Sequence, residues 1–240
     1  MKKNVGIILG IAFGFIFMVS SVWALPSGPT GVSILGSGRY STSSAANISA
    51  MAGNTTEINL NGTTITQTWQ GYYGNVTGTI VLGNSNNQTL YNWNLTSPSG
   101  QIYATRVASV PSWTSVRCAN QTEVDLEDLA LGVNSSRDGD SVNRTFTNTT
   151  TFNQFFVGSL NINTSQNCRA VHLFNSTGEA SPDFAEVLLS DTNNVIYTGL
   201  ISNPALGFDN RTHQFEMLVG QDGHLGGPAS TPYYFYLELN

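Results

Sequence analysis

The sequence contains no lysine after Lys3 and few charged residues of any kind. Charged side chains make up 10 % of the chain, and beyond Lys3 its seven arginines are set against fifteen acidic residues. A chain with so little positive charge does not attract phosphate backbones, so we expect no nucleic-acid partner. The missing lysines also exclude subunit linkage through lysine isopeptide bonds in the part of the chain after Lys3.

Motifs of catalytic and cofactor sites are missing as well. The sequence has no G-x-S-x-G motif and no phosphate-binding loop, and His172, His213 and His224 show no metal-ligand spacing. A catalytic triad needs a nucleophile, a base and an orienting acid, and no such set is indicated. We therefore expect no enzyme, no metal and no cofactor.

Two groups of acidic residues are the remaining candidates for a site. The first is Glu123, Asp125, Glu127 and Asp128, in a segment predicted to be a short helix with Thr122 as its N-cap and Gly132 as its end. We interpret these four acids as a solvated helix face rather than a glycosidase pair. The second is Asp138 and Asp140, which have loop spacing for calcium but lack the twelve-residue pattern, so a polar turn is the simpler interpretation.

The chain has two cysteines, Cys118 and Cys168. In an exported protein an isolated pair is most simply one disulfide, which would close a loop worth about 4 kcal/mol in the chain-entropy model. Two buried thiols are the alternative.

The N-terminus predicts export. Lys2 and Lys3 precede an apolar run from Val5 to Val19. Val22 and Ala24 are the small residues at positions −3 and −1 of a cleavage site after Ala24. This pattern is typical of a signal peptide over residues 1–24, cleaved after Ala24. A retained membrane anchor and a type IV pilin leader are the alternatives. Any membrane contact is expected through this segment only.

Asn-x-Ser/Thr sequons are far more frequent than chance, which would give about five. There are thirteen, at Asn47, Asn54, Asn61, Asn75, Asn87, Asn94, Asn120, Asn134, Asn143, Asn148, Asn163, Asn175 and Asn210. N-linked glycans are bulky and solubilising, so each occupied asparagine must face outward. None has an acid two residues before it, as the usual bacterial transferase prefers; this favours an archaeal host, with a eukaryotic one second.

Short apolar or alternating runs recur between turns rich in Gly, Asn, Asp and Pro. We expect strands at 31–36, 56–60, 63–73, 78–83, 89–95, 101–108, 155–162, 168–174, 184–190, 194–201, 213–219 and 233–239. About 10–12 strands at this spacing predict an all-β sandwich, Ig-like or jelly-roll-like, with at most one short helix. We expect one such domain over residues 51–240, preceded by an extension and linker over residues 25–50.

Large aromatic residues in these runs are either core or sugar-binding. Trp69 falls on the Ile65 face of an alternating strand, and Tyr91 and Trp93 alternate in the same way. We therefore expect these three in the core or packed under glycans. Tyr72 and Tyr73 are an alternative sugar-stacking pair.

Several segments together resemble a family of uncharacterised secreted archaeal surface proteins. They are AGNTTEINL, TQTWQGYYGNVTGTI, LYNW, GQIYATR and YYFYLELN, running from about Met51 onward, with WQGYYGNVTG the most specific. The resemblance implies an archaeal cell exterior and carries over no catalytic residue. The chain has no pilin motif.

These observations favour a secreted, heavily glycosylated structural subunit of an extracellular filament or surface coat, with other copies of itself as partner. A carbohydrate-binding or adhesive module is the alternative. Because lysine linkage is excluded, assembly would be non-covalent or through disulfides. We expect Val32 and Ile34 to anchor an N-terminal strand donated to the next subunit. An ordinary first strand of a monomer is the competing interpretation.

Overall fold

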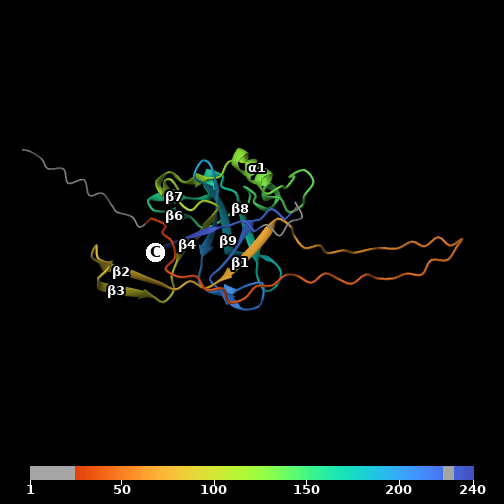
Figure 1. The fold of residues 1–240 in the computed structure, drawn as a ribbon, viewed down its shortest axis with the longest axis horizontal. Helices are drawn as coiled ribbons and strands as arrows, with labels where there is room; N and C mark the ends of the chain where they lie inside the picture. The colour runs from red at the N-terminus through yellow and green to blue at the C-terminus, as the bar shows by residue number, and fades with distance from the viewer. Residues whose placement is uncertain (1–24, 224–229) are drawn as a thin grey trace, which may run out of the picture.

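The computed structural model describes residues 25–223 and 230–240 (Figure 1). The predicted signal peptide, residues 1–24, and His224 lie outside the described residues.

A six-stranded antiparallel sheet forms the centre of the body. Its strands are β4 (Gly100–Thr105), β5 (Arg117–Cys118), β8 (Ala170–Phe174), β9 (Ala180–Ser190), β10 (Val195–Ile201) and β14 (Tyr234–Leu239). The order across the sheet is β14-β4-β10-β9-β5, and β8 also pairs with β9. The pairs β14/β4 and β4/β10 join segments that lie far apart in the sequence.

Other elements cover both faces of this sheet. On one face lies the antiparallel ribbon of β1 (Trp69–Gly74) and β13 (Phe215–Gly220), with helix α1 (Gln121–Ala130) and the single turn α2 (Val142–Thr145) beside it. The other face carries β6 (Phe155–Val157), β7 (Leu160–Ile162) and the 3₁₀ turn η1 (Trp113–Ser115). The turn η2 (Thr164–Gln166) and the two-residue strands β11 (Ala205–Leu206) and β12 (Thr212–His213) complete the body.

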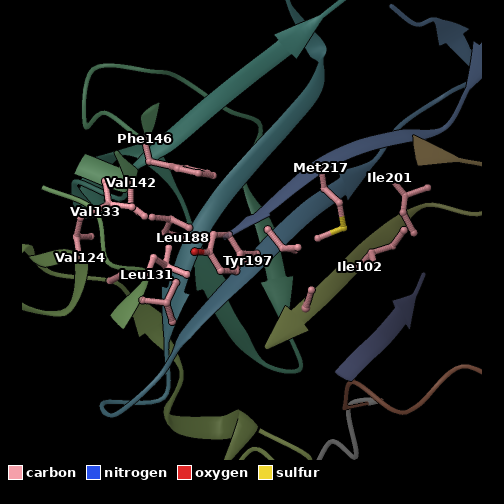
Figure 2. Close-up of a cluster of buried hydrophobic side chains, with 14 residues drawn as sticks. Ile102, Val124, Leu131, Val133, Val142, Phe146, Leu188, Tyr197, Ile201 and Met217 are labelled. Atoms are coloured by element: carbon pink, nitrogen blue, oxygen red, sulfur yellow. The ribbon is translucent and has the colours of Figure 1, made fainter. Parts of the chain in front are cut away.

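Two hydrophobic cores form because successive residues of a strand point to opposite faces. In β10, Tyr197 points into the core shared with α1 and β13, and Ile196 into the core shared with β6 and β7. In β4, Ile102 points into the core with α1 and β13, and Tyr103 points into the core with β6 and β7. Figure 2 shows the first core, where Met217 from β13 and Phe146 from the end of α2 approach Tyr197 and Leu188 of the sheet.

The predicted all-β, sandwich-like class is confirmed. The described residues form fourteen strands, more than expected, because the predicted run 155–162 splits into β6 and β7 and several strands are two or three residues long. Helix α1 lies where a helix was predicted, but its N-cap is Asn120 rather than Thr122: the Asn120 side chain accepts from the Glu123 N–H and the Glu123 carboxylate accepts from the Asn120 N–H. Gly132, at φ +68°, follows the helix end as expected.

Residues 28–67 form what we call the N-terminal arm. Its base is fixed where Ser27 and Leu237 of β14 exchange backbone hydrogen bonds of 3.1 and 2.8 Å. Pro29, two residues on, cannot donate to a ladder, and the chain leaves the sheet there. No residue of the arm belongs to a helix or strand, and nearly all are exposed.

The predictions of strands at 31–36 and 56–60 and of strand before Trp69 in 63–73 were therefore wrong for the single chain. The packed body begins at Thr68, later than the expected boundary at residue 51. An alternating pattern predicts a half-buried strand but not which chain supplies its partner. Within residues 25–223 and 230–240 of one copy, these segments meet no neighbouring strand.

Candidate functional site

A second protruding element is the hairpin of β2 (Gly78–Gly83) and β3 (Thr89–Leu95), both strands with the bounds predicted from the sequence. It pairs with no other strand among the described residues. In Figure 1 it projects from one end of the molecule, and the N-terminal arm projects from the opposite end.

The hairpin has one apolar face. Ile80 is paired with Trp93 and Leu82 with Tyr91, so these four side chains lie on the same side of the two strands. Their exposed fractions are 46 % for Ile80, 50 % for Leu82, 59 % for Tyr91 and 48 % for Trp93. We call them the hairpin apolar face.

The opposite face of the hairpin is more polar, although Val81 lies on it. Thr79 is paired with Asn94, and the Thr79 hydroxyl donates to the Asn94 side-chain oxygen over 3.3 Å. Asn94 is a sequon asparagine, and a second one, Asn87, lies in the connecting turn at φ +60°. A glycan at Asn94 would leave the hairpin apolar face uncovered.

The expectation that Tyr91 and Trp93 belong to the core was therefore wrong. Both alternate as half-buried strand residues do, but no described part of the chain forms a second layer above the face they share. Their rings contact each other edge-on, with centroids 4.9 Å apart.

Trp69 does pack against the core, as predicted. Its indole N–H donates to the Asp140 carbonyl oxygen over 2.6 Å. Its ring lies 5.7 Å from Phe146 and 6.2 Å from Tyr197 between centroids.

Tyr72 and Tyr73 lie apart from each other rather than forming one sugar-stacking surface. Adjacent strand residues point to opposite faces, and Tyr72 meets Phe235 whereas Tyr73 meets Phe208. Both line an open groove of about 510 Å³ between β1, β13 and β8, and Gly38 of the arm also lines it. The arm of the same copy thus already passes along this groove.

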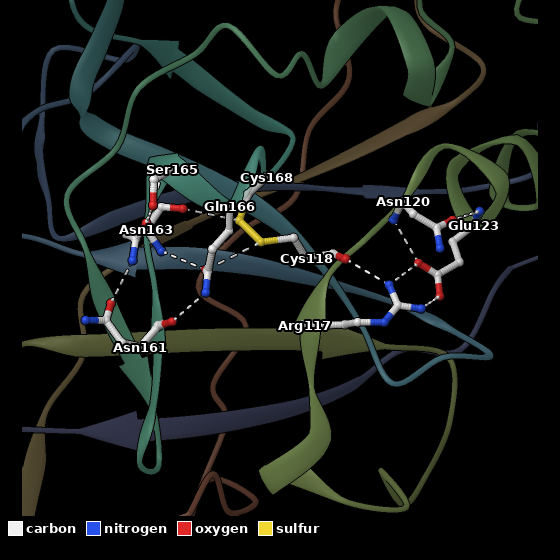
Figure 3. The surroundings of a disulfide bond; sticks show 9 residues. All are labelled: Arg117, Cys118, Asn120, Glu123, Asn161, Asn163, Ser165, Gln166 and Cys168. Atoms are coloured by element: carbon white, nitrogen blue, oxygen red, sulfur yellow. Dashed lines mark hydrogen bonds and ion pairs between the residues drawn. A yellow bond between two sulfur atoms is a disulfide. The ribbon is translucent and has the colours of Figure 1, made fainter.

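The two cysteines form the predicted disulfide. Cys118 at the end of β5 is bonded to Cys168 just before β8, with 4.9 Å between the Cα atoms. Figure 3 shows a sequon asparagine on each side of it: Asn120 caps α1, and Asn163 caps η2 by accepting from the Ser165 N–H over 3.0 Å. A disulfide is typical of an oxidising compartment. Across the described residues, no helix has the length and apolar character needed to span a membrane.

The positions of the thirteen sequon asparagines allow glycosylation. Ten are exposed, three (Asn143, Asn163 and Asn175) are half-buried, and none is buried. At Asn120, Asn163 and Asn175 it is the side-chain oxygen that accepts local hydrogen bonds. The glycan would be attached to the side-chain nitrogen.

We expect at least half of the sequons to be occupied in protein purified from its own host, because none requires unfolding to become accessible. Intact-protein mass spectrometry before and after chemical deglycosylation measures the occupancy. A native mass equal to that of the bare chain would contradict the prediction.

The interpretation of the α1 acids as a solvated face was wrong. Asp125 is exposed, but Glu123, Glu127 and Asp128 are 8 %, 3 % and 3 % exposed. The helix lies with this face against the sheet, where Arg117 pairs with Glu123, and Arg106 with Glu127. No feature of the sequence showed that the body would supply these partners.

Each of these buried carboxylates has a structural role. Glu127 accepts from the Tyr197 hydroxyl over 3.0 Å, and Asp128 accepts from the Val142 N–H over 2.7 Å at the start of α2. Burial raises the pKa of both carboxyls. For Glu123, hydrogen bonds from Arg117, Asn120 and Ser190 outweigh the opposing effect of burial and lower the pKa.

Three further carboxyls are buried without an arginine partner. Glu186 is fully buried, and one of its oxygens accepts from the Leu218 N–H over 2.8 Å while the other has no partner. Glu238 accepts from the Tyr103 hydroxyl over 2.9 Å, and Glu216 from the Phe208 N–H over 3.1 Å. Burial raises the pKa of all three, and raises that of Glu186 well above its ordinary value.

The other candidate ligand residues take part in local hydrogen bonds. Asp138 accepts from the Asn134 N–H over 2.7 Å, and the Asp140 side chain accepts from the Thr66 hydroxyl. His172 contacts the Thr151 carbonyl oxygen, and His213 the Asp209 carboxylate. Within the described ranges, no group of three or more potential metal ligands lies together.

No family model, no curated protein and no solved structure matches this chain. The resemblance to archaeal surface proteins stays a prediction, and a function has to be inferred from the geometry of the chain itself.

Proposed function

We propose that the chain is exported, N-glycosylated and assembled non-covalently into an extracellular filament or surface coat, each subunit donating its N-terminal arm to a neighbouring copy. The protein has a structural role in this proposal and carries out no reaction. The sequon density and the disulfide support an extracellular location.

The observation that carries this proposal is the exposure of apolar side chains along the arm. Val32 is 73 % exposed and Ile34 is 87 % exposed, although the two alternate as the buried side of a strand does. In a monomer these exposed side chains contribute no burial energy to the stability of the fold. In the proposed filament they are the inserted anchors.

Strand donation explains why the arm is extended and nearly uncharged. When the arm pairs with a strand of a neighbour, its backbone gains hydrogen bonds. Its alternating apolar side chains are then buried on one face of the enlarged sheet. Arm and body belong to the same chain but engage different copies, so the contact is heterologous. Such a contact continues into a filament when its rotation does not close a ring.

We expect the substitution of Val32 and Ile34 together by aspartate (V32D/I34D) to abolish filaments, because two charges would have to be buried without partners. The measurement is negative-stain electron microscopy, with sedimentation, of mature protein from the native host. Ile58 and Leu60 supply the matched control: they form a second exposed alternating pair in the same arm, 50 % and 78 % exposed.

The control variant I58D/L60D should assemble as the parent does. Filaments of V32D/I34D would contradict the role of these anchors, and a native mature protein that never assembles would contradict the filament itself.

A second candidate function, carbohydrate binding, is favoured by the exposed Tyr91–Trp93 pair. Aromatic faces stack on sugar rings, and these two side chains are accessible. Affinity electrophoresis of the parent and of Trp93→Ala in gels containing polysaccharide tests it. Retardation that disappears in the variant, in a protein that does not form filaments, would favour this function over the first.

A further inference from the structure

We propose that the hairpin apolar face is the acceptor for the donated arm, so that Val32 and Ile34 of one copy pack against Ile80, Leu82, Tyr91 and Trp93 of the next. This inference rests on the proposed filament and names the surface that the arm binds. It concerns two copies of this chain and needs no other protein.

The hairpin is incomplete as it stands. A two-stranded hairpin is marginally stable in water, and three strands or a packed layer are needed for independent stability. Both outer edges of the β2–β3 pair are unpaired among the described residues. A third strand would satisfy backbone groups at one edge, and its side chains would pack beside those of the apolar face in the same step.

The spacing of the apolar residues in the arm matches that of the hairpin. Val32 and Ile34 are two residues apart, as are Ile80 and Leu82 in β2 and Tyr91 and Trp93 in β3. In adjacent strands, side chains with this period lie side by side on one face. An added strand 31–36 would therefore extend the apolar face from two strands to three.

The placement of the two elements fits a head-to-tail contact. The hairpin and the arm project from opposite ends of the molecule in Figure 1. The donor segment 31–36 lies nearer the base of the arm, between Ser27 on β14 and Gly38 in the groove. In each copy it is distinct from the hairpin acceptor, so the contact is heterologous and can propagate without closing.

The exposed area of the chain is large enough for such a contact. The chain exposes 16,793 Å², whereas a compact protein of its mass exposes about 10,500 Å². Even if the residues outside the described ranges contributed the area of an unfolded chain, about 4,700 Å², an excess of roughly 2,600 Å² would remain over a compact body of that size. Obligate interfaces bury about 2,000–5,000 Å².

The few charges of the hairpin and the arm, and the position of the sequon at Asn94, are compatible with docking of the arm on the hairpin apolar face. Residues 78–95 contain no charged side chain, and the arm contains only Arg39 and Glu57, so the contact would bury few charges. The sequon residue Asn94 lies on the opposite face of the hairpin, where a glycan would not obstruct docking.

Two other assignments fit the observations less well. A sugar-binding surface accounts for Tyr91 and Trp93 but not for the aliphatic Ile80 and Leu82 beside them. The groove between β1, β13 and β8 is already lined by Gly38 of the same copy's arm, so it is less open to a second arm than the hairpin.

The test uses mature protein from the native host and the double variant I80T/W93T, which keeps β-forming residues while removing the apolar face. We expect subunit affinity to fall by about thirty-fold or more, the factor typical of losing an interface hot spot. The matched control is Val81→Thr on the opposite face of β2, which should leave assembly unchanged. Far-ultraviolet circular dichroism should match the parent in both variants, because the hairpin lies outside the two cores.

A mixing experiment separates the acceptor from the donor. V32D/I34D keeps an intact hairpin, and I80T/W93T keeps an intact arm, so each should be monomeric alone and an equimolar mixture should give only one-to-one dimers in analytical ultracentrifugation. Filaments of I80T/W93T would overturn the acceptor while leaving arm donation standing. Dimers of V32D/I34D alone would show hairpin-to-hairpin contact and overturn it as well. A parent protein without filaments would instead count against the proposed function.

Discussion

Replacement of Trp69 by alanine is expected to lower the free energy of unfolding by about 3–5 kcal/mol, the range for removing a large aromatic side chain from a core. The ring fills the space between Phe146 and Tyr197, and its N–H satisfies the Asp140 carbonyl oxygen. Alanine leaves a cavity and an unpaired acceptor together. Urea unfolding followed by far-ultraviolet circular dichroism measures the change.

Trp93→Ala is the matched control for this prediction. The same substitution on the exposed hairpin face should cost the monomer less than about 1 kcal/mol, because the ring packs on no core there. Equal losses at the two positions would contradict the assignment of Trp69 to the core and Trp93 to the surface. Trp69→Phe should lie between, since it keeps most of the ring packing and loses the hydrogen bond.

The second large effect expected is a loss of stability as the pH rises. Burial raises the pKa of Glu127, Asp128, Glu186, Glu216 and Glu238, so each binds its proton more tightly in the folded chain than in the unfolded chain. The stability that such groups contribute is complete below the unfolded carboxyl pKa, about 4, and is lost as the pH rises through the raised folded values.

Two carboxyls act in the opposite direction. The pKa of Glu123 is lowered. Burial opposes ionisation of Asp209, but hydrogen bonds from His213 and Arg211 together outweigh it and hold the pKa of Asp209 at about 2. Their stabilising contribution is present above the unfolded pKa and is lost in acid. Because more groups are raised than lowered, we expect the melting temperature to be higher near pH 4 than near pH 8.

Glu186→Gln isolates the largest contributor to this pH dependence. Glutamine has the shape of the protonated acid, so the variant should match the parent at pH 4. At pH 8 it should be more stable by about 2–4 kcal/mol, because an unpaired buried charge costs several kcal/mol. Glu179→Gln, at an exposed position, is the control and should leave the pH profile unchanged. A Glu186→Gln profile parallel to that of the parent would contradict this assignment.

Most of the strand pattern of the body followed from the sequence. The strands β2, β3, β9, β10, β13 and β14 form where alternating or apolar runs end at turn residues, and those signals are local. The pairings of β14 with β4 and of β4 with β10 were not predicted, because they depend on contacts between residues such as Tyr103 and Glu238, 135 positions apart.

The surface was harder to predict than the core, for a physical reason. Periodicity identified Trp69, Trp93, Val32 and Ile34 as equally suited to burial, but burial depends on what lies above a face. Trp69 has Phe146 above it, whereas Trp93 has no covering layer. The acids of α1 gave the opposite error: they were expected to face solvent but are buried, because the fold brings Arg106 and Arg117 to them.

The position of β14 in the sheet also has a consequence for the time at which glycans would be added under the proposed function. If the chain is exported from its N-terminus, β4 is exposed long before β14 arrives to cover it. All thirteen sequons precede β14 in the sequence, so every one of them would pass a membrane-bound oligosaccharyltransferase while the sheet is still unfinished. Pairing between strands this distant in sequence is slow, which would lengthen that interval. Even the half-buried Asn143, Asn163 and Asn175 would then meet the transferase as parts of an open polypeptide, before the completed sheet closes around them.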